Sequence, residues 1–212
     1  MSTTRSAGPV TSATPVITLT RRTIDRVLVG FGVVAALVFV TAGGLLTWGA
    51  GFSDDYVHDE LSSQQVFFPD EAALRAEGRD DLVRWAGEQV TTGEGAEAYA
   101  SYIEGHLEGI ADGQTYAQID DRGARAAVEE ARESGASEAE IAELQATADE
   151  LTAQRDTLFK GETLRGLLLS SYAWSTIGRI AGIASVVAYA AGAGMALLVG
   201  AGVVHLRKER AR

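Results

Sequence analysis

The residues best suited to chemistry are a few histidines placed among many carboxylates. His58 has Asp54, Asp55 and Asp59 close by in the chain, and Asp54 and His58 share one helix face at a spacing of four. Imidazole and carboxylate groups brought together can bind a cation weakly. A solvated, acidic helix end explains the same residues without a ligand, and this is the interpretation that we favour.

The other two histidines suggest no site. His106 lies beside an apolar stripe with Tyr99 and Tyr102, and His205 ends an apolar run. The sequence has no nucleophile elbow, phosphate loop, H-E-x-x-H helix or EF-hand loop. It also has no cysteine, which excludes disulfides and thiolate zinc sites. We therefore predict no catalytic residue, no metal and no cofactor, in a protein that is not an enzyme.

The apolar residues that would carry any site are concentrated in two blocks. The chain of 212 residues is 46% hydrophobic and 22% charged, but residues 27–53 and 180–204 contain no formal charge. The first block, at about 1.5 Å per residue, makes roughly 40 Å of helix, enough to cross a hydrocarbon core of about 30 Å. The blocks therefore predict two transmembrane helices. The first is too long for a cleaved signal peptide and is interpreted as a signal anchor.

Charge predicts how the two spans are oriented. Residues 1–26 and 205–212 each carry four basic groups and one acidic group, whereas the acidic groups dominate residues 53–179 and give the chain a net charge of −11. Basic flanks belong in the cytoplasm, so we expect both termini inside and the middle of the chain outside the cell membrane. No basic face is present, which excludes a nucleic-acid binder.

These signals divide the chain into five parts. Residues 1–22 are rich in Ser and Thr and are predicted to be a disordered cytoplasmic tail. Residues 24–52 form the first transmembrane helix and residues 172–206 the second. Between them, residues 53–171 form an acidic extracytoplasmic helical domain, and residues 207–212 form a basic cytoplasmic tail.

Local patterns in the middle region predict helices throughout. Pro69 and Asp70 are typical of a helix start, residues 94–111 carry an amphipathic stripe, and Asp112 with Gly113 is typical of a turn. Residues 121–133 repeat that pattern weakly. The last helix begins at a capping box and continues through a short coiled-coil seam into the second span; the box is Ser137 with Glu140, and the seam is Ile141, Leu144, Ala148, Leu151 and Leu158, interrupted by Arg155. The expected fold class is all-α, with two transmembrane helices flanking an outer helical bundle continuous with them.

The second span repeats small residues at every fourth position, which is the set Ala184, Ala188, Gly192, Ala196 and Gly200. Small residues let helix backbones approach closely, and this drives association in lipid. We interpret the set as a helix-packing face. Gly32 with Ala36, and Gly43 with Gly44, offer a face on the first span; another copy or another membrane protein are the alternative partners.

The runs YVHDELSSQQVFFPDEAAL and VTTGEGAEAYASYIEGHLEGIADGQTYAQI, set between two spans, resemble a family of small actinobacterial membrane proteins. The resemblance covers roughly residues 20–206 and implies a two-span topology. Some members carry the label of aromatic ring-opening dioxygenase, an activity that would require a non-haem iron held by histidine and carboxylate ligands. The middle region has only two histidines, His58 and His106, and we assign no iron site to it.

Three classes of function follow from these features. The first is a structural or accessory subunit of the cell envelope, which acts through helix packing and protein–protein contacts with a membrane partner or a second copy. The alternative is an extracytoplasmic sensor or binding domain that signals through a separate partner, because the tails are too short to hold a signalling domain. An enzyme is the third class, and no residue supports it.

Overall fold

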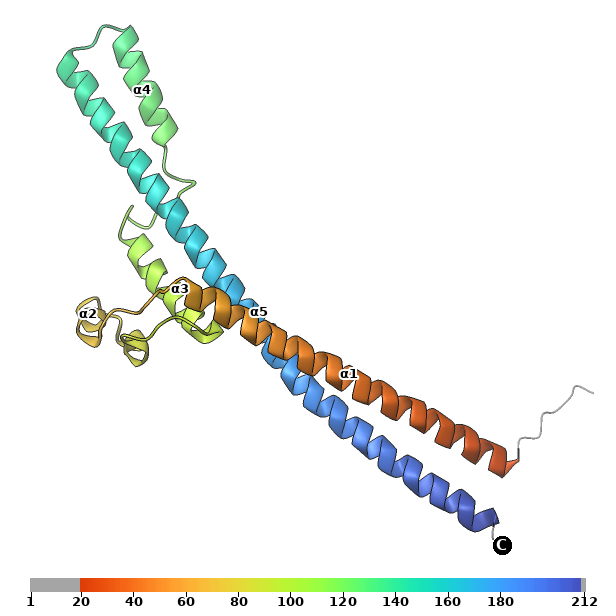
Figure 1. Ribbon diagram of the computed structural model, residues 1–212. Helices are drawn as coiled ribbons and strands as arrows, with labels where there is room; N and C mark the ends of the chain where they lie inside the picture. The colour runs from red at the N-terminus through yellow and green to blue at the C-terminus, as the bar shows by residue number, and fades with distance from the viewer. Residues whose placement is uncertain (1–19, 211–212) are drawn as a thin grey trace, which may run out of the picture. The chain divides into compact units, whose positions relative to one another are not determined.

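The computed structural model describes residues 20–210, and the fold over this range is all-α. The elements are α1 (Arg21–Ser63), α2 (Glu71–Ala76), the 3₁₀ helix η1 (Asp80–Trp85), α3 (Gly93–Glu108), α4 (Asp121–Glu133) and α5 (Glu138–Arg210) (Figure 1). No strand occurs in this range, and β pairing is limited to an isolated bridge between Phe67 and Gln89. The prediction of an all-α chain is therefore confirmed for the described residues. Most of the predicted N-terminal tail lies outside the described residues.

The chain forms two compact units, and the two long helices pass through both of them. One unit consists of the chain up to residue 43 together with residues 186–212, and the other consists of residues 44–185. We call the first the terminal unit and the second the central unit. Both α1 and α5 are long and apolar enough to cross a membrane, with only 11% and 6% of their most apolar windows buried.

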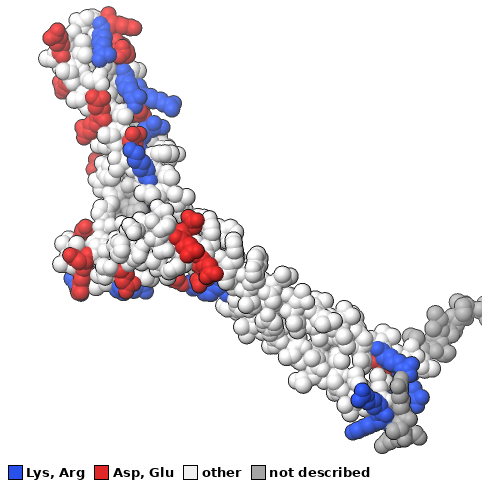
Figure 2. Space-filling model, in the orientation of Figure 1, with Lys and Arg blue, Asp and Glu red and all other residues white. Residues whose placement is uncertain are grey.

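The terminal unit is a pair of helix segments, one from α1 and one from α5. The α1 segment begins at Arg21, slightly before the predicted end of the tail, because the basic residues there already adopt helical geometry. Large apolar side chains of both segments point outward: Phe31 of α1 is 72% exposed and Leu197 of α5 is 76% exposed. Charged side chains gather at one end of this unit, and the rest of the face shown in Figure 2 is uncharged.

The central unit is built on the part of α1 that continues to Ser63. Val57 and Leu61 of α1 are buried in a core with Leu74 of α2, Leu82 of η1 and Val90 of the segment before α3. The cap predicted at Asp70 is present, because its side chain accepts a hydrogen bond of 2.8 Å from the backbone N–H of Ala73. These caps and buried positions are local signals, which is why the sequence could supply them.

A second core joins α3 to the middle of α5. Leu107 of α3 lies directly over Gly161 of α5 and packs with Leu158 and Ile119. An ideal Cβ at Gly161 would come within 2.4 Å of Leu107 Cδ2, so glycine allows the close approach. The amphipathic stripe predicted for residues 94–111 therefore serves both cores, with Ala96 in the first and Leu107 in the second.

The charged residue that interrupts the predicted seam on α5 has a partner on α4. The carboxylate of Asp121 is 4% exposed and lies 2.7 Å from Arg125 and 3.5 Å from Arg155. The helix α5 also begins where it was predicted to begin, because the Glu140 N–H donates a hydrogen bond of 3.3 Å to Ser137 Oγ. Arg155 therefore occupies a seam position because a buried carboxylate faces it.

The N-terminus of α3 is held on α5 by charge and by close backbone approach. Arg179 of α5 pairs with Glu94 in the first turn of α3. An ideal Cβ at Gly93 would meet Ser175 Cβ at 2.3 Å. Ser53 of α1 adds a buried hydrogen bond of 2.7 Å to the carbonyl oxygen of Trp174. These contacts fix α1, α3 and α5 around one groove.

Candidate functional site

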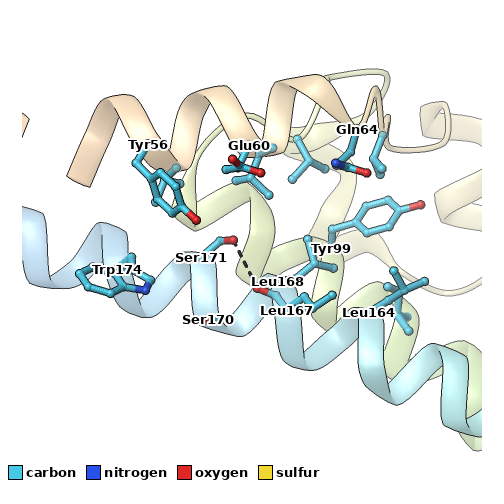
Figure 3. A pocket seen from close by; sticks show the side chains of 15 residues that line it. Tyr56, Glu60, Gln64, Tyr99, Leu164, Leu167, Leu168, Ser170, Ser171 and Trp174 are labelled. Carbon is cyan, nitrogen blue, oxygen red and sulfur yellow. Dashed lines mark hydrogen bonds between the residues drawn. The ribbon is translucent and has the colours of Figure 1, made fainter. Parts of the chain in front are cut away.

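The central unit has a groove of about 580 Å³ between α1, α3 and α5 (Figure 3). Such a volume lies in the range of sites that bind small ligands or apolar side chains. We call this surface the outer groove. Its apolar lining is Val57, Leu61, Val66, Val90, Ile103, Leu164, Leu167, Leu168 and Trp174.

One wall of the outer groove is open and apolar. Leu164 and Leu167 of α5 are 55% and 62% exposed, and Trp174 is 49% exposed. Leu167 and Trp174 are seven residues apart on one helix, so they follow the same face over two turns. Together with Leu164 they form a continuous exposed apolar strip beside the groove, the kind of surface that binds a partner or a ligand.

Polar groups also line the outer groove. They are the carboxylate of Glu60, the amide of Gln64 and the hydroxyls of Tyr56, Tyr99, Ser170 and Ser171. Among the lining residues Glu60 is the one formal charge, and no Lys or Arg balances it. Ser171 Oγ donates to the carbonyl oxygen of Leu167 at 3.3 Å, which anchors it to its own helix. Burial raises the pKa of Tyr99, so that hydroxyl is neutral at pH 7.

The groove chemistry is therefore that of binding. An apolar group can fill it and a cationic or hydrogen-bonding group can face Glu60. Its lining has no imidazole or thiol, and no base is paired with either serine. The sequence analysis missed this site, because its lining residues lie on three helices and only the exposure of Leu164 and Leu167 distinguishes them from core residues.

The histidines lie where the sequence could only partly place them. His58 and its neighbours Asp54, Asp55 and Asp59 are all exposed, which agrees with a solvated helix end. His106 is a boundary residue, with its ring 4.5 Å from that of Tyr102 and Nε2 3.9 Å from Glu77.

Within residues 20–210, one group of three potential metal ligands is brought together. It consists of Asp25, His205 and Glu209, with one ligand atom from each within 4.8 Å of the others. The group joins the start of α1 to the end of α5. Sequence reasoning missed it, because no local spacing connects residues so far apart.

The structure divides the small-residue set predicted on the second span. Gly192 is buried against α1, where its Cβ position lies 3.2 Å from Val40, and Ala188 is partly buried. Ala196 and Gly200 are exposed, and nothing lies within 4 Å of the Gly200 Cβ position. Each step of four residues advances about 40° beyond a full turn. A strict repeat of four therefore turns gradually around the helix, so Gly192 faces α1 while Ala196 and Gly200 do not; that the five residues form one packing face stays a prediction.

The face of α5 that contacts α1 in the terminal unit alternates between large and small side chains. Val199 packs on Gly32, Tyr189 packs on Gly43, and Val29 of α1 packs on Gly202, with Cβ positions at 2.7, 3.0 and 2.8 Å respectively. Gly32 and Gly43 belong to the partner face that was predicted on the first span. Ala184, in the central unit, is partly buried.

Comparison with known proteins finds no family model, no curated protein and no solved structure that matches this chain.

Proposed function

We propose that this is a two-span protein of the cell membrane, with both termini in the cytoplasm and residues 53–171 outside. Two observations support the topology. The apolar windows of α1 and α5 are almost entirely exposed, whereas the core helix of a soluble protein is mostly buried. Basic residues flank the spans on the terminal side, and acidic residues dominate between the spans.

The aromatic residues that follow the first span support the same proposal. Trp48 and Phe52 are 70% and 55% exposed, and their ring centroids lie 5.7 Å apart. Phe52 stacks in turn on Tyr56, at 6.1 Å. Exposed aromatic rings in such a row are typical of the interface between lipid and water.

The function that the geometry supports best is that of an accessory subunit of the cell envelope. The observation that carries it is the open, apolar wall of the outer groove. We assign the groove to an apolar helix of a membrane-protein partner, with a basic side chain facing Glu60. Glu60 is the one charge in the lining. In the proposed topology Trp174 would lie at the membrane surface, which supports a partner helix that leaves the membrane beside the groove.

Photo-crosslinking in native membranes tests this proposal. The chain has no cysteine, so Leu167→Cys can carry a benzophenone in the groove. Leu169→Cys serves as the matched control, because Leu169 is exposed, lies about 200° further around the same helix and does not line the groove. We expect one partner to crosslink from position 167 and not from 169, and Glu60→Lys to abolish the product. Equal products from both positions, or a product insensitive to Glu60→Lys, would refute the assignment.

The polar groups in the groove support a second function, an extracytoplasmic domain that binds a small amphiphile and signals through a separate partner. A cationic amphiphile fits an apolar wall that faces Glu60. Dodecylamine added to the full chain in nanodiscs should then raise its melting temperature, and Glu60→Gln should remove the increase. In the crosslinking experiment this function gives a lipid product from position 167. The absence of a shift would count against it.

A further inference from the structure

A cluster of ionisable side chains in the terminal unit lies outside the proposed function. His205 and Glu209 are one turn apart on α5, with Nε2 and Oε1 separated by 3.4 Å. Asp25 faces them from α1 and contributes a third ligand atom within 4.8 Å of the other two. The cluster thus combines one imidazole and two carboxylates from two helices.

The surroundings of Asp25 favour the binding of a cation. Its Oδ2 atom is buried and has no hydrogen-bond partner among the described residues. A cavity of about 310 Å³ adjoins it, with walls formed by Leu28, Val29, Gly32, Met195, Leu198, Val199 and Gly202. Asp25 and His205 are the two polar side chains of that cavity. A buried carboxylate oxygen without a partner is costly, and a bound cation removes that cost.

We propose that Asp25, His205 and Glu209 bind a divalent transition metal of the zinc class. Two ligands about 2.0 Å from a tetrahedral zinc lie roughly 3.3 Å apart, which matches the separation between His205 and Glu209. A mixed imidazole and carboxylate set suits Zn²⁺ or Fe²⁺ better than Mg²⁺ or Ca²⁺, which prefer oxygen ligands alone. Three protein ligands leave a fourth position for water or a partner's side chain.

The basic residues nearby set a limit on the affinity without occupying the site. Arg22 donates to the backbone carbonyl oxygen of Glu209 at 3.5 Å, which leaves the Glu209 carboxylate for His205 or the metal. Arg26 and Arg207 are close in sequence to the ligands and repel a cation. Since the ligands come from α1 and α5, a bound metal would link these two helices at the ends that the proposed topology puts in the cytoplasm.

Zinc binding by the full chain tests the proposal. The metal-depleted protein, purified in detergent with any histidine tag removed, is titrated with Zn²⁺ by calorimetry, and the bound metal is counted by mass spectrometry. We expect one zinc per chain, and binding at least about tenfold weaker in His205→Ala, Asp25→Asn and Glu209→Gln. His58→Ala is the matched control, because it removes an exposed histidine that also has acidic neighbours.

The outcomes separate the site from adventitious binding. Circular dichroism establishes that each variant keeps its helices, so a loss of zinc binding reports on the ligand and not on folding. No stoichiometric zinc in the wild-type chain would overturn the proposal. Binding that survives in all three ligand variants, or that is lost in His58→Ala, would also overturn it. The groove variants leave this measurement unchanged, so its result is independent of the proposed function.

Discussion

The contact between Gly161 and Leu107 gives the sharpest test of how the outer groove is held in place. Replacement of Gly161 by Ala puts a methyl group 2.4 Å from Leu107 Cδ2 and 3.1 Å from Leu107 Cγ, inside a buried contact. Gly166 lies five residues further along α5 and is open, because nothing lies within 4 Å of its Cβ position. Gly166→Ala is therefore the matched control in the same helix.

The magnitude follows from two opposing effects. In the interior of a helix, Gly→Ala stabilises by about 1 kcal/mol at either position. Overpacking at Gly161 costs about 1–3 kcal/mol, because Leu107 must move away from its core. The helix propensity cancels between the two variants, so Gly161→Ala should be less stable than Gly166→Ala by about 1–3 kcal/mol.

Native-state hydrogen exchange of α3, in the full chain in detergent, measures this difference. A difference of about 1–3 kcal/mol corresponds to roughly 5- to 150-fold faster exchange of the amides in α3 in Gly161→Ala. In a Leu107→Ala background, Gly161→Ala should instead behave like the Gly166 variant, because the clash is gone. Equal exchange in the two single variants, or a penalty that persists without Leu107, would refute the packing argument.

Other predictions concern the charged and polar groups of the central unit. Asp121→Ala should destabilise the packing of α4 on α5 by about 1–2 kcal/mol, because it removes the ion pairs to Arg125 and Arg155, whose side chains are 56% and 34% exposed and remain solvated; hydrogen exchange of α4 measures this, and unchanged exchange would contradict it. Burial raises the pKa of Tyr99 above 10.0, so the folded state keeps the phenolic proton that the unfolded chain releases. Stability should therefore be fully present below about pH 10 and fall as the pH rises above it. A Tyr99→Phe variant, followed by tyrosinate absorbance and thermal unfolding, should lose part of that decline, because burial also raises the pKa of Tyr102. Ser53→Ala removes the hydrogen bond to Trp174 and should cost about 1 kcal/mol, seen as faster exchange where α1 contacts α5; unchanged exchange would mean that the hydroxyl adds nothing to this contact.

The sequence by itself determined the features that depend on neighbours along the chain. Two long runs without a formal charge predict the apolar helices, because each run is long enough to cross the hydrocarbon core of a membrane. Asp70 and Ser137 mark helix starts, because a capping side chain bonds the backbone only a few residues ahead. The stripe on α3 was readable for the same reason, since helical periodicity is a local property.

Only the tertiary structure decided which distant side chains meet. In the sequence Arg155 only interrupts an apolar seam, whereas the structure shows that Asp121 faces it. The cluster of His205 with Asp25 likewise joins residues near opposite ends of the chain. The small-residue repeat shows the same limit, because rotation about the helix axis turns Gly200 away from α1 while Gly192 stays buried. Spacing along one helix fixes which residues share a face, but packing between helices fixes which faces meet, and the outer groove exists only through such packing.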